Sequence, residues 1–191
     1  MSVYLKKIKR PYLIIALLCV SVISYWYIQI DHSNPPPKKV YSANADYPVL
    51  DNVYQLADKA DLIVIGKFTG DRTPKIYTDE NNTPIIRASI SSFKINKVVK
   101  GSINDKNIFV IEPASDEDDA IYTIEGYNLM NTSDKYVLFL NNSDEEGYRI
   151  VGMYQGQYNL SKDSETVLFD SKDSKDHHKE LKQQVKGIYK D

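Results

Sequence analysis

The sequence of 191 residues contains one cysteine, one tryptophan and three histidines. A single cysteine excludes a disulfide framework and any metal cluster that several thiolates would hold. The motifs G-x-S-x-G, H-E-x-x-H and G-x-G-x-x-G and the Walker phosphate loop do not occur. The histidines are His32 and the adjacent His177 and His178, so the predicted β-rich region has none to activate a serine nucleophile. We therefore expect no catalytic residues and no bound cofactor.

Positive charge is concentrated at the N-terminus. Four of the 24 basic residues and none of the 26 acidic residues lie in residues 1–30, so the rest of the chain carries 20 basic against 26 acidic side chains. An acidic segment of this kind repels phosphate groups. Nucleic acid is therefore not expected as a partner.

Residues 11–30 form an uncharged, largely apolar run of twenty residues. A helix of this length spans about 30 Å, the thickness of the hydrocarbon core of a bilayer. Basic residues precede the run and resist translocation, while aromatic residues gather at its far end, as at a membrane interface. The predicted anchor residues are Lys6, Lys7, Lys9, Arg10, Tyr25, Trp26 and Tyr27. We expect a single-pass membrane protein with residues 1–10 in the cytoplasm, the lipid bilayer as a partner through residues 11–30, and the C-terminal part outside.

A cleaved signal peptide is the alternative interpretation of the same run. Its apolar core is usually about 7–15 residues long, and the small residues Val22 and Ser24 are possible cleavage positions. The chain would then be secreted. Leu18 precedes Cys19 where a lipoprotein signal needs a small residue, so lipidation is not expected. Both interpretations export the rest of the chain.

Three further segments follow the apolar run. Residues 31–48 include three consecutive prolines and predict an extended stalk. Residues 49–170 are predicted to form one β domain, which opens with a short helix at Asp51–Ala60. Residues 171–191 predict an amphipathic helix from about Lys175, with Ser174 as its cap and Leu181, Val185 and Ile188 on one face.

Short apolar and β-branched runs predict the strands of this domain. They lie at 62–68, 72–77, 86–100, 107–112, 136–140, 148–151 and 166–169. In the long strand the buried parity switches after Ile90, which predicts a bulge or bend at Ser91–Ser92. The acidic stretch Pro113–Thr132 is expected to be a loop.

The predicted fold class is mainly β. Five to seven short strands, one of them strongly bent, favour a partly closed, OB-like barrel with an N-terminal transmembrane helix and short flanking helices. An immunoglobulin-like sandwich is the alternative, although the sequence lacks its paired cysteines.

Four runs resemble a known group of proteins: Ala60–Lys67 (ADLIVIGK), Phe93–Gly101 (FKINKVVKG), Lys135–Leu140 (KYVLFL) and Gly156–Tyr158 (GQY). Their order resembles a group of uncharacterised exported bacterial proteins, and it is similar to the OB-fold barrel of netrin-like modules, which include the tissue inhibitors of metalloproteinases. The resemblance covers roughly residues 50–170 and implies the fold rather than an activity. Because those inhibitors use a free N-terminal cysteine and the exported part here has none, no inhibitory residue is carried over. The resemblance and the excess of lysine over arginine lead us to expect a low-GC Gram-positive bacterium as the source.

Two clusters of polar residues suggest a metal site as an alternative. His177 and Glu180 would share a helix face, with Asp173 and Asp176 nearby. The acidic residues 116–119 could attract calcium, but they lack the alternating spacing of an EF-hand loop. Exposed charge on a helix and a loop is the interpretation that we favour for both.

Tyrosine occurs 15 times, and some of these rings should be exposed, where they could stack on a sugar or a protein partner. Tyrosine is also a good strand residue, so a structural use is the interpretation that we favour. The candidate residues are Tyr122, Tyr127, Tyr148, Tyr154 and Tyr158. The leading hypothesis is a membrane-anchored, extracytoplasmic binding module without catalytic activity, whose partner is a protein or a component of the cell wall. The alternatives are a metal-binding or hydrolytic extracytoplasmic enzyme and an inhibitor of an extracytoplasmic protease.

The orientation can be tested with protease added to whole cells that express the full chain. Digestion of the C-terminal part in intact cells is expected, because the basic residues hold the N-terminus inside. If that part is digested only after the cells are lysed, the predicted orientation is wrong.

Overall fold

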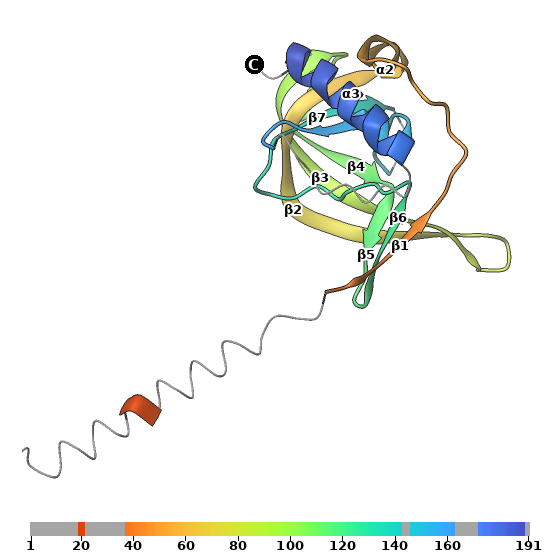
Figure 1. The fold of residues 1–191 in the computed structure, drawn as a ribbon, viewed down its shortest axis with the longest axis vertical. Helices are drawn as coiled ribbons and strands as arrows, with labels where there is room; N and C mark the ends of the chain where they lie inside the picture. The colour runs from red at the N-terminus through yellow and green to blue at the C-terminus, as the bar shows by residue number, and fades with distance from the viewer. Residues whose placement is uncertain (1–18, 22–36, 143–145, 163–171, 190–191) are drawn as a thin grey trace, which may run out of the picture. The chain divides into compact units, whose positions relative to one another are not determined.

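The computed structural model describes residues 19–21, 37–142, 146–162 and 172–189 (Figure 1). It divides into two compact units, which meet in sequence between Pro37 and Lys38. Residues 19–21 are helical, and the remainder of the predicted membrane segment 11–30 lies outside the described residues. Within the described part of the chain, no helix is long and apolar enough to cross a membrane.

The unit that starts at Lys38 is mainly β, as predicted. Its elements in chain order are β1 (Lys39–Ala43), α2 (Val53–Lys59), β2 (Leu62–Thr78), β3 (Pro84–Lys100), β4 (Asn107–Glu112), β5 (Ala114–Asp116), β6 (Ala120–Ile124), β7 (Tyr136–Asn141), β8 (Tyr148–Ile150), the 3-10 helix η1 (Met153–Gly156), β9 (Gln157–Asn159) and α3 (Lys172–Tyr189). The predicted strand at 166–169 lies outside the described residues.

Six strands form one curled sheet in the order β2-β3-β4-β8-β7-β9. The start of β2 also pairs with β7, in register from Leu62 with Leu140 to Gly66 with Tyr136. The link between β4 and β7 is the three-residue strand β8, which shares only two residue pairs with each of them. The prediction of a barrel is therefore wrong: the six-stranded sheet is curled, but it is not closed into a barrel.

The long strands β2 and β3 bend together near the predicted position. Their register shifts between the pairs Phe68–Phe93 and Arg72–Ser91, so β2 has two more residues than β3 in this interval. The extra length belongs to β2, and the prediction of a bulge at Ser91–Ser92 placed it on the wrong strand. Gly70, with a φ of 101°, supplies the unusual conformation that this turn in β2 requires.

A second, three-stranded sheet has the order β1-β6-β5. The strand β1 lies in the segment predicted as a stalk, and it pairs in parallel with β6. Both β5 and β6 lie in the stretch Pro113–Thr132, so the prediction of a loop there is wrong. The sequence did not indicate β1, because four of its five residues are exposed and so show no alternation of buried apolar residues.

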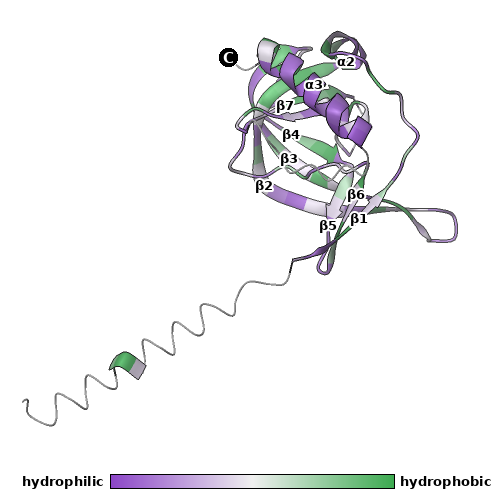
Figure 2. Cartoon of the chain, in the orientation of Figure 1, coloured by the Kyte–Doolittle hydropathy of each residue, from purple (hydrophilic) through white to green (hydrophobic). Residues whose placement is uncertain are grey.

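The start of β2 and residues 136–140 of β7 are buried on both faces, which explains their continuous apolar sequences. One face, with Val64 and Leu138, lies inside the curl of the sheet. The other face, with Ile63 and Phe139, is covered by the helices α2 and α3 (Figure 2). The alternation of strand residues thus builds two cores, one on each side of β2 and β7.

Both helices differ in detail from the prediction. The cap of α2 is Asn52, whose side chain accepts hydrogen bonds from the backbone N–H groups of Tyr54 and Gln55 at 3.0 Å. Helix α3 begins at Lys172, so Ser174 lies within its first turn and is not its cap. Of the predicted apolar face of α3, Leu181 and Val185 are buried, whereas Ile188 is exposed.

Two glycines allow a matched test of how closely β2 packs against β3 at Gly66. An added Cβ at Gly66 would clash with the carbonyl oxygen of Lys94 and lie 2.7 Å from the ring of Phe93, whereas one at Gly187 in α3 would have no neighbour within 4 Å. We expect Gly66→Ala to lower the free energy of unfolding by about 3 kcal/mol. Gly187→Ala should raise it by about 1 kcal/mol through helix propensity. Urea denaturation of the full chain measures both, and equal effects would contradict the packing at Gly66.

Candidate functional site

The adjacent histidines of α3 pack the helix onto the rest of the unit. The Nε2 atom of His177 lies 2.9 Å from the carbonyl oxygen of Leu50, and its Nδ1 atom lies 3.4 Å from the hydroxyl of Tyr154. The ring of His178 stacks on Tyr158 at 5.2 Å between centroids. Asp173, Asp176 and Glu180 are exposed. In the described ranges, no group of three or more His, Cys, Asp or Glu side chains could hold a metal ion.

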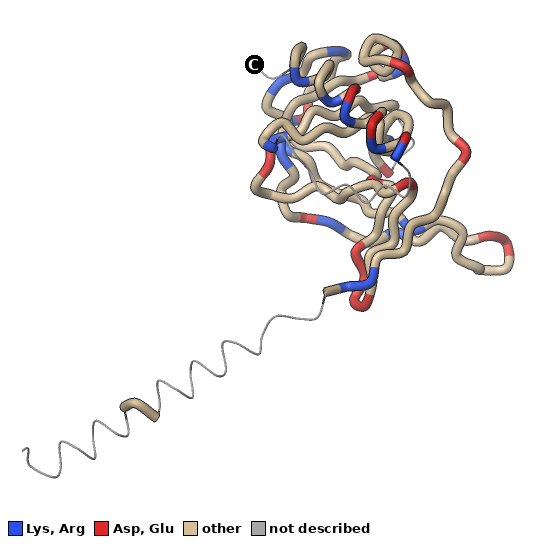
Figure 3. The backbone as a smooth tube through the Cα atoms, viewed as in Figure 1, with Lys and Arg blue, Asp and Glu red and all other residues tan. Residues whose placement is uncertain are grey.

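The acidic residues 116–119 lie at the turn between β5 and β6, and two of them are held by cations (Figure 3). Lys38 donates to Asp116 at 2.6 Å. Arg87 donates to both carboxylate oxygens of Glu117 at 2.6 Å. These pairs connect the residue before β1, and strand β3, to the turn, so both carboxylates already have cationic partners within the fold.

A buried ion pair lies where β2 bends. The carboxylate of Glu112 is fully buried, and its Oε2 atom accepts hydrogen bonds from Arg72 Nε at 3.0 Å and Arg72 Nη2 at 2.8 Å, and also from Ser91 Oγ. The Oε1 atom accepts from the hydroxyl of Tyr127 at 3.0 Å and from the backbone N–H of Met130 at 2.8 Å. With five donors around it, the carboxylate is well satisfied inside the protein.

The same cluster fixes the loop before β7. Arg72 also donates to the carbonyl oxygen of Met130 at 2.6 Å, and its guanidinium lies 4.3 Å from the centre of the Phe68 ring. Burial, and then the charge of Glu112, raise the pKa of Tyr127 well above its ordinary value, so the hydroxyl stays protonated and donates. The cluster stabilises the bend and the loop, and its carboxylate is closed to solvent.

The predicted set of tyrosines does not form one surface. Tyr127, Tyr154 and Tyr158 are buried in the two cores. Tyr122 and Tyr148 are half-buried. The structure therefore does not place these five residues on one exposed surface, because strand tyrosines here mostly fill the interior.

Tyr122 takes part in a different arrangement, which sequence reasoning missed. Its ring stacks on the exposed Tyr41 of β1 at 5.4 Å and 18°, and the guanidinium of Arg87 lies 4.3 Å from its centre. The hydrogen bond to Glu117 raises the pKa of Arg87, which stays charged in this stack. The pairing of β1 with β6 brings Tyr41 and Tyr122 together, and no local pattern in the sequence indicates it.

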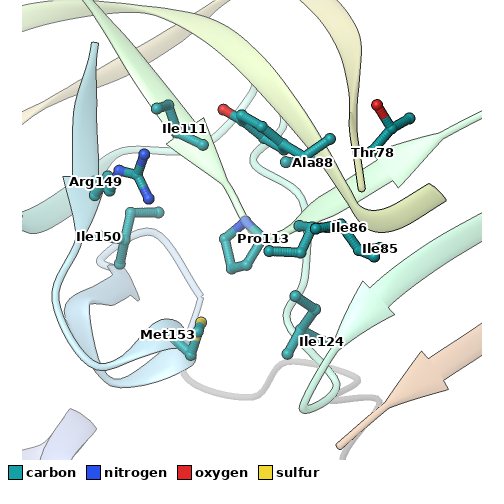
Figure 4. A pocket seen from close by; sticks show the side chains of 11 residues that line it. Thr78, Ile85, Ile86, Ala88, Ile111, Pro113, Ile124, Arg149, Ile150 and Met153 are labelled. Atoms are coloured by element: carbon teal, nitrogen blue, oxygen red, sulfur yellow. The ribbon is translucent and has the colours of Figure 1, made fainter. Parts of the chain in front are cut away.

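An apolar pocket of about 400 Å³ lies where the distal halves of β2 and β3 meet the ends of β4, β6 and β8 (Figure 4). It is lined by Tyr77, Thr78, Ile85, Ile86, Ala88, Ile111, Pro113, Ile124, Arg149, Ile150 and Met153. Figure 4 shows Pro113 at the centre, with Ile111, Ile150 and Met153 on one side and Ile85, Ile86 and Ile124 on the other. This volume is within the range of small-molecule sites, about 300–1,000 Å³.

A second pocket of about 360 Å³ adjoins the first. The two share Ile85, Ile86, Ile124 and Met153, and the second continues along β1 past Tyr41. Ile85 is 62% exposed and Ile86 is 44% exposed, although both are large and apolar. We call the two pockets together the isoleucine cleft.

Comparison with models of known protein families finds no match to this chain, and comparison with curated proteins finds no related sequence. The isoleucine cleft is therefore the feature of the described residues from which a function can be inferred.

The buried pair can be compared with a surface pair in the same chain. Glu112→Gln should lower the free energy of unfolding by about 3–5 kcal/mol, since it leaves Arg72 without its counter-charge. Tyr127→Phe should cost about 1 kcal/mol for its single hydrogen bond. Glu146→Gln should cost no more than about 1 kcal/mol, because its ion pair with Lys75 is partly exposed on both sides. Urea denaturation followed by circular dichroism gives the order, and a loss for Glu112→Gln as small as that for Glu146→Gln would contradict it.

Proposed function

We propose that the protein is a membrane-anchored, extracytoplasmic binding module without catalytic activity, and that it binds an apolar ligand in the isoleucine cleft. The observation that carries the proposal is the exposure of Ile85 and Ile86 in the walls of two adjoining pockets. Apolar patches of this kind on a folded surface mark binding sites.

The lining of the cleft favours binding over chemistry. The eleven residues of the first pocket include no Asp, Glu, His, Cys, Ser or Lys. The pocket therefore offers neither a nucleophile with a base nor a pair of carboxylates. The metal-dependent and protease-inhibitor alternatives have no observation among the described residues in their favour.

The walls of the cleft belong to strands of the two sheets, which form a rigid scaffold for binding a ligand. One wall belongs to the distal halves of β2 and β3, which continue beyond the bend at Arg72. The other wall comes from β4, β6, β8 and η1. The cluster around Glu112 holds the base of these walls, so the cleft exists before a ligand arrives and binding needs little reorganisation.

The sequence supports the anchored state of this proposal. The uncharged run 11–30 follows four basic residues and ends only eight residues before β1 begins at Lys39. The relation to netrin-like modules stays a prediction from the sequence, since no family model and no curated protein matches the chain.

Binding in the cleft can be measured by methyl NMR of the full chain in phosphatidylcholine nanodiscs. Addition of decan-1-ol should shift the isoleucine methyl signals of the cleft, including those of Ile85, Ile86 and Ile124, because the alkyl chain displaces water from them. The signals of Ile63 and Ile65, which lie in the core beneath the helices, should not move.

Two substitutions in the distal halves of β2 and β3 provide the control for binding in the cleft. Ile86 lines both pockets, whereas Ile76 lines neither, and the two side chains are 44% and 43% exposed. Ile86→Asp should weaken the binding of decan-1-ol at least tenfold, since burial of an alkyl chain beside a charge is unfavourable. Ile76→Asp should leave it unchanged. Equal responses, or cleft signals that never shift, would overturn the proposal.

A further inference from the structure

We infer that β1 is a dimerisation strand: two copies of this chain pair their β1 strands antiparallel about a two-fold axis, with Ser42 of one copy opposite Ser42 of the other. Such pairing goes beyond the proposed function, since it needs no ligand in the isoleucine cleft. Its basis is a row of unpaired backbone groups along β1, together with the charge and size of the side chains on either side of Ser42.

Strand β1 lies at the edge of the three-stranded sheet, and in the described part of the chain it pairs only with β6. On the side of β6, the carbonyl oxygen of Ala43 accepts from the backbone N–H of Glu125 at 2.9 Å, and the N–H of Ala45 donates to the Glu125 side chain at 2.8 Å. Successive residues of a paired strand direct their backbone groups to opposite sides. We call the side away from β6 the outer edge of β1. The backbone groups on this outer edge are those of Val40, Ser42 and Asn44.

The outer edge of β1 is regular and exposed. All five residues of the strand pair with β6 in one continuous register, so no bulge interrupts the edge. Two large side chains of the strand reach solvent, since Val40 is 43% exposed and Tyr41 is 50% exposed. An open edge of this kind is a template for another strand, and folded proteins interrupt, charge or cover it. Lys39 is the one charged residue within the strand, and a second copy of β1 would supply the cover.

The free backbone groups and two flanking prolines restrict how two β1 strands pair. Residues of the outer edge bond only with one another, so the two-fold axis passes through a residue and not between two residues. Pro37 and Pro48 have no N–H to donate, and they therefore bound the segment that can pair. A centre at Ser42 matches residues 38–46 with themselves, which is the longest such pairing that places neither proline opposite a residue of the outer edge.

The side chains favour the same centre. It places the exposed Lys38 opposite the exposed Asp46 of the second copy at both ends of the pair, and opposite charges across an antiparallel pair are favourable. The ammonium of Lys38 has three donors, so it keeps its bond to Asp116. The centre also sets Tyr41 opposite the small Ala43 in a non-hydrogen-bonded pair, where side chains lie closest. A shift of the centre by one residue moves Lys38 away from Asp46 and loses both ion pairs.

Pairing of this kind stops at two copies. A two-fold axis uses the same edge of both chains, so no outer edge of β1 remains open. The two three-stranded sheets become one continuous sheet in the order β5-β6-β1-β1-β6-β5. Strands that add to a sheet edge are held mainly by main-chain hydrogen bonds. The stability of the dimer therefore comes from these bonds and from the two ion pairs.

Cysteine cross-linking of the purified full chain in dodecyl maltoside tests this register, in a Cys19→Ala background that removes the only thiol. Ser42→Cys should form a disulfide dimer on oxidation, because opposite Cα atoms of a hydrogen-bonded pair lie about 5.5 Å apart. Val40→Cys is the matched control. It should form at least about fivefold less dimer, since Val40 faces Asn44 and lies about 14 Å from Val40 of the other copy. An equimolar mixture of Val40→Cys and Asn44→Cys chains should cross-link again.

A change of charge tests the ion pairs. Asp46→Lys in the Ser42→Cys chain should lower the yield of disulfide dimer at least about threefold, because Lys38 then faces a like charge. Asp105→Lys makes the same change at an exposed residue between β3 and β4, and it should leave the yield unchanged.

Three results would overturn the inference. Equal dimer yields from Ser42→Cys and Val40→Cys would show random collision. No dimer from Ser42→Cys, or none from the mixture of Val40→Cys and Asn44→Cys, would show that β1 does not pair about Ser42. Equal losses with Asp46→Lys and Asp105→Lys would show general charge repulsion instead of a defined register. All of these results leave the test with decan-1-ol unaffected.

Discussion

The structure depends on the ion pair between Arg72 and Glu112. Arg72 is the residue at which β2 resumes its pairing with β3 after the bend, and Glu112 is the last residue of β4. Through Tyr127 and Met130 the same carboxylate also holds the loop that leads into β7. A buried charge is tolerated only when its partner and hydrogen bonds are in place, so the pair requires one arrangement of these three segments. The bend then carries the distal part of β2 and β3 away from the curled sheet, and this departure opens the cleft.

The long and strongly apolar elements were predictable from the sequence. Strand β4 has the predicted bounds, and β7 ends one residue beyond its predicted end. Both strands were predictable because each contains a run of consecutive apolar residues. The short strands β1, β5 and β6 were not predictable. Four of the five residues of β1 are exposed, β5 has only three residues, and β6 is a short run directly after the acidic residues 116–119. The partner of β1 lies far along the chain, as in the pair of Lys39 with Ala120. The cleft escaped prediction for the same reason, since Ile85 and Ile86 indicate a strand while Ile124 and Met153 come from distant parts of the chain.

Several polar side chains are buried in this protein, while two large apolar side chains of β3 are exposed. Glu112, Asp134 and Gln155 are buried and hydrogen-bonded, whereas Ile85 and Ile86 face solvent. Burial has the largest single effect on the pKa of Asp134 and raises it. The hydrogen bonds from Lys162, Asn131 and Asn159 each lower this pKa, and together they exceed the effect of burial, so the pKa lies below its ordinary value. Polar groups therefore define the joints between segments, and the apolar side chains left outside define the surface available to a ligand.

The parallel pairing of β1 with β6 has a consequence for the order in which the domain forms. The long strands β2 and β3 are joined by the short turn at Asp79–Thr83, so they can pair as soon as both are free. Strand β1 precedes them in the chain but can pair only when β6 is available, and closing so long a loop is slow. The cleft is therefore expected to form late, since its side along β1 is complete only when strands whose paired residues lie 81 positions apart in the sequence have met.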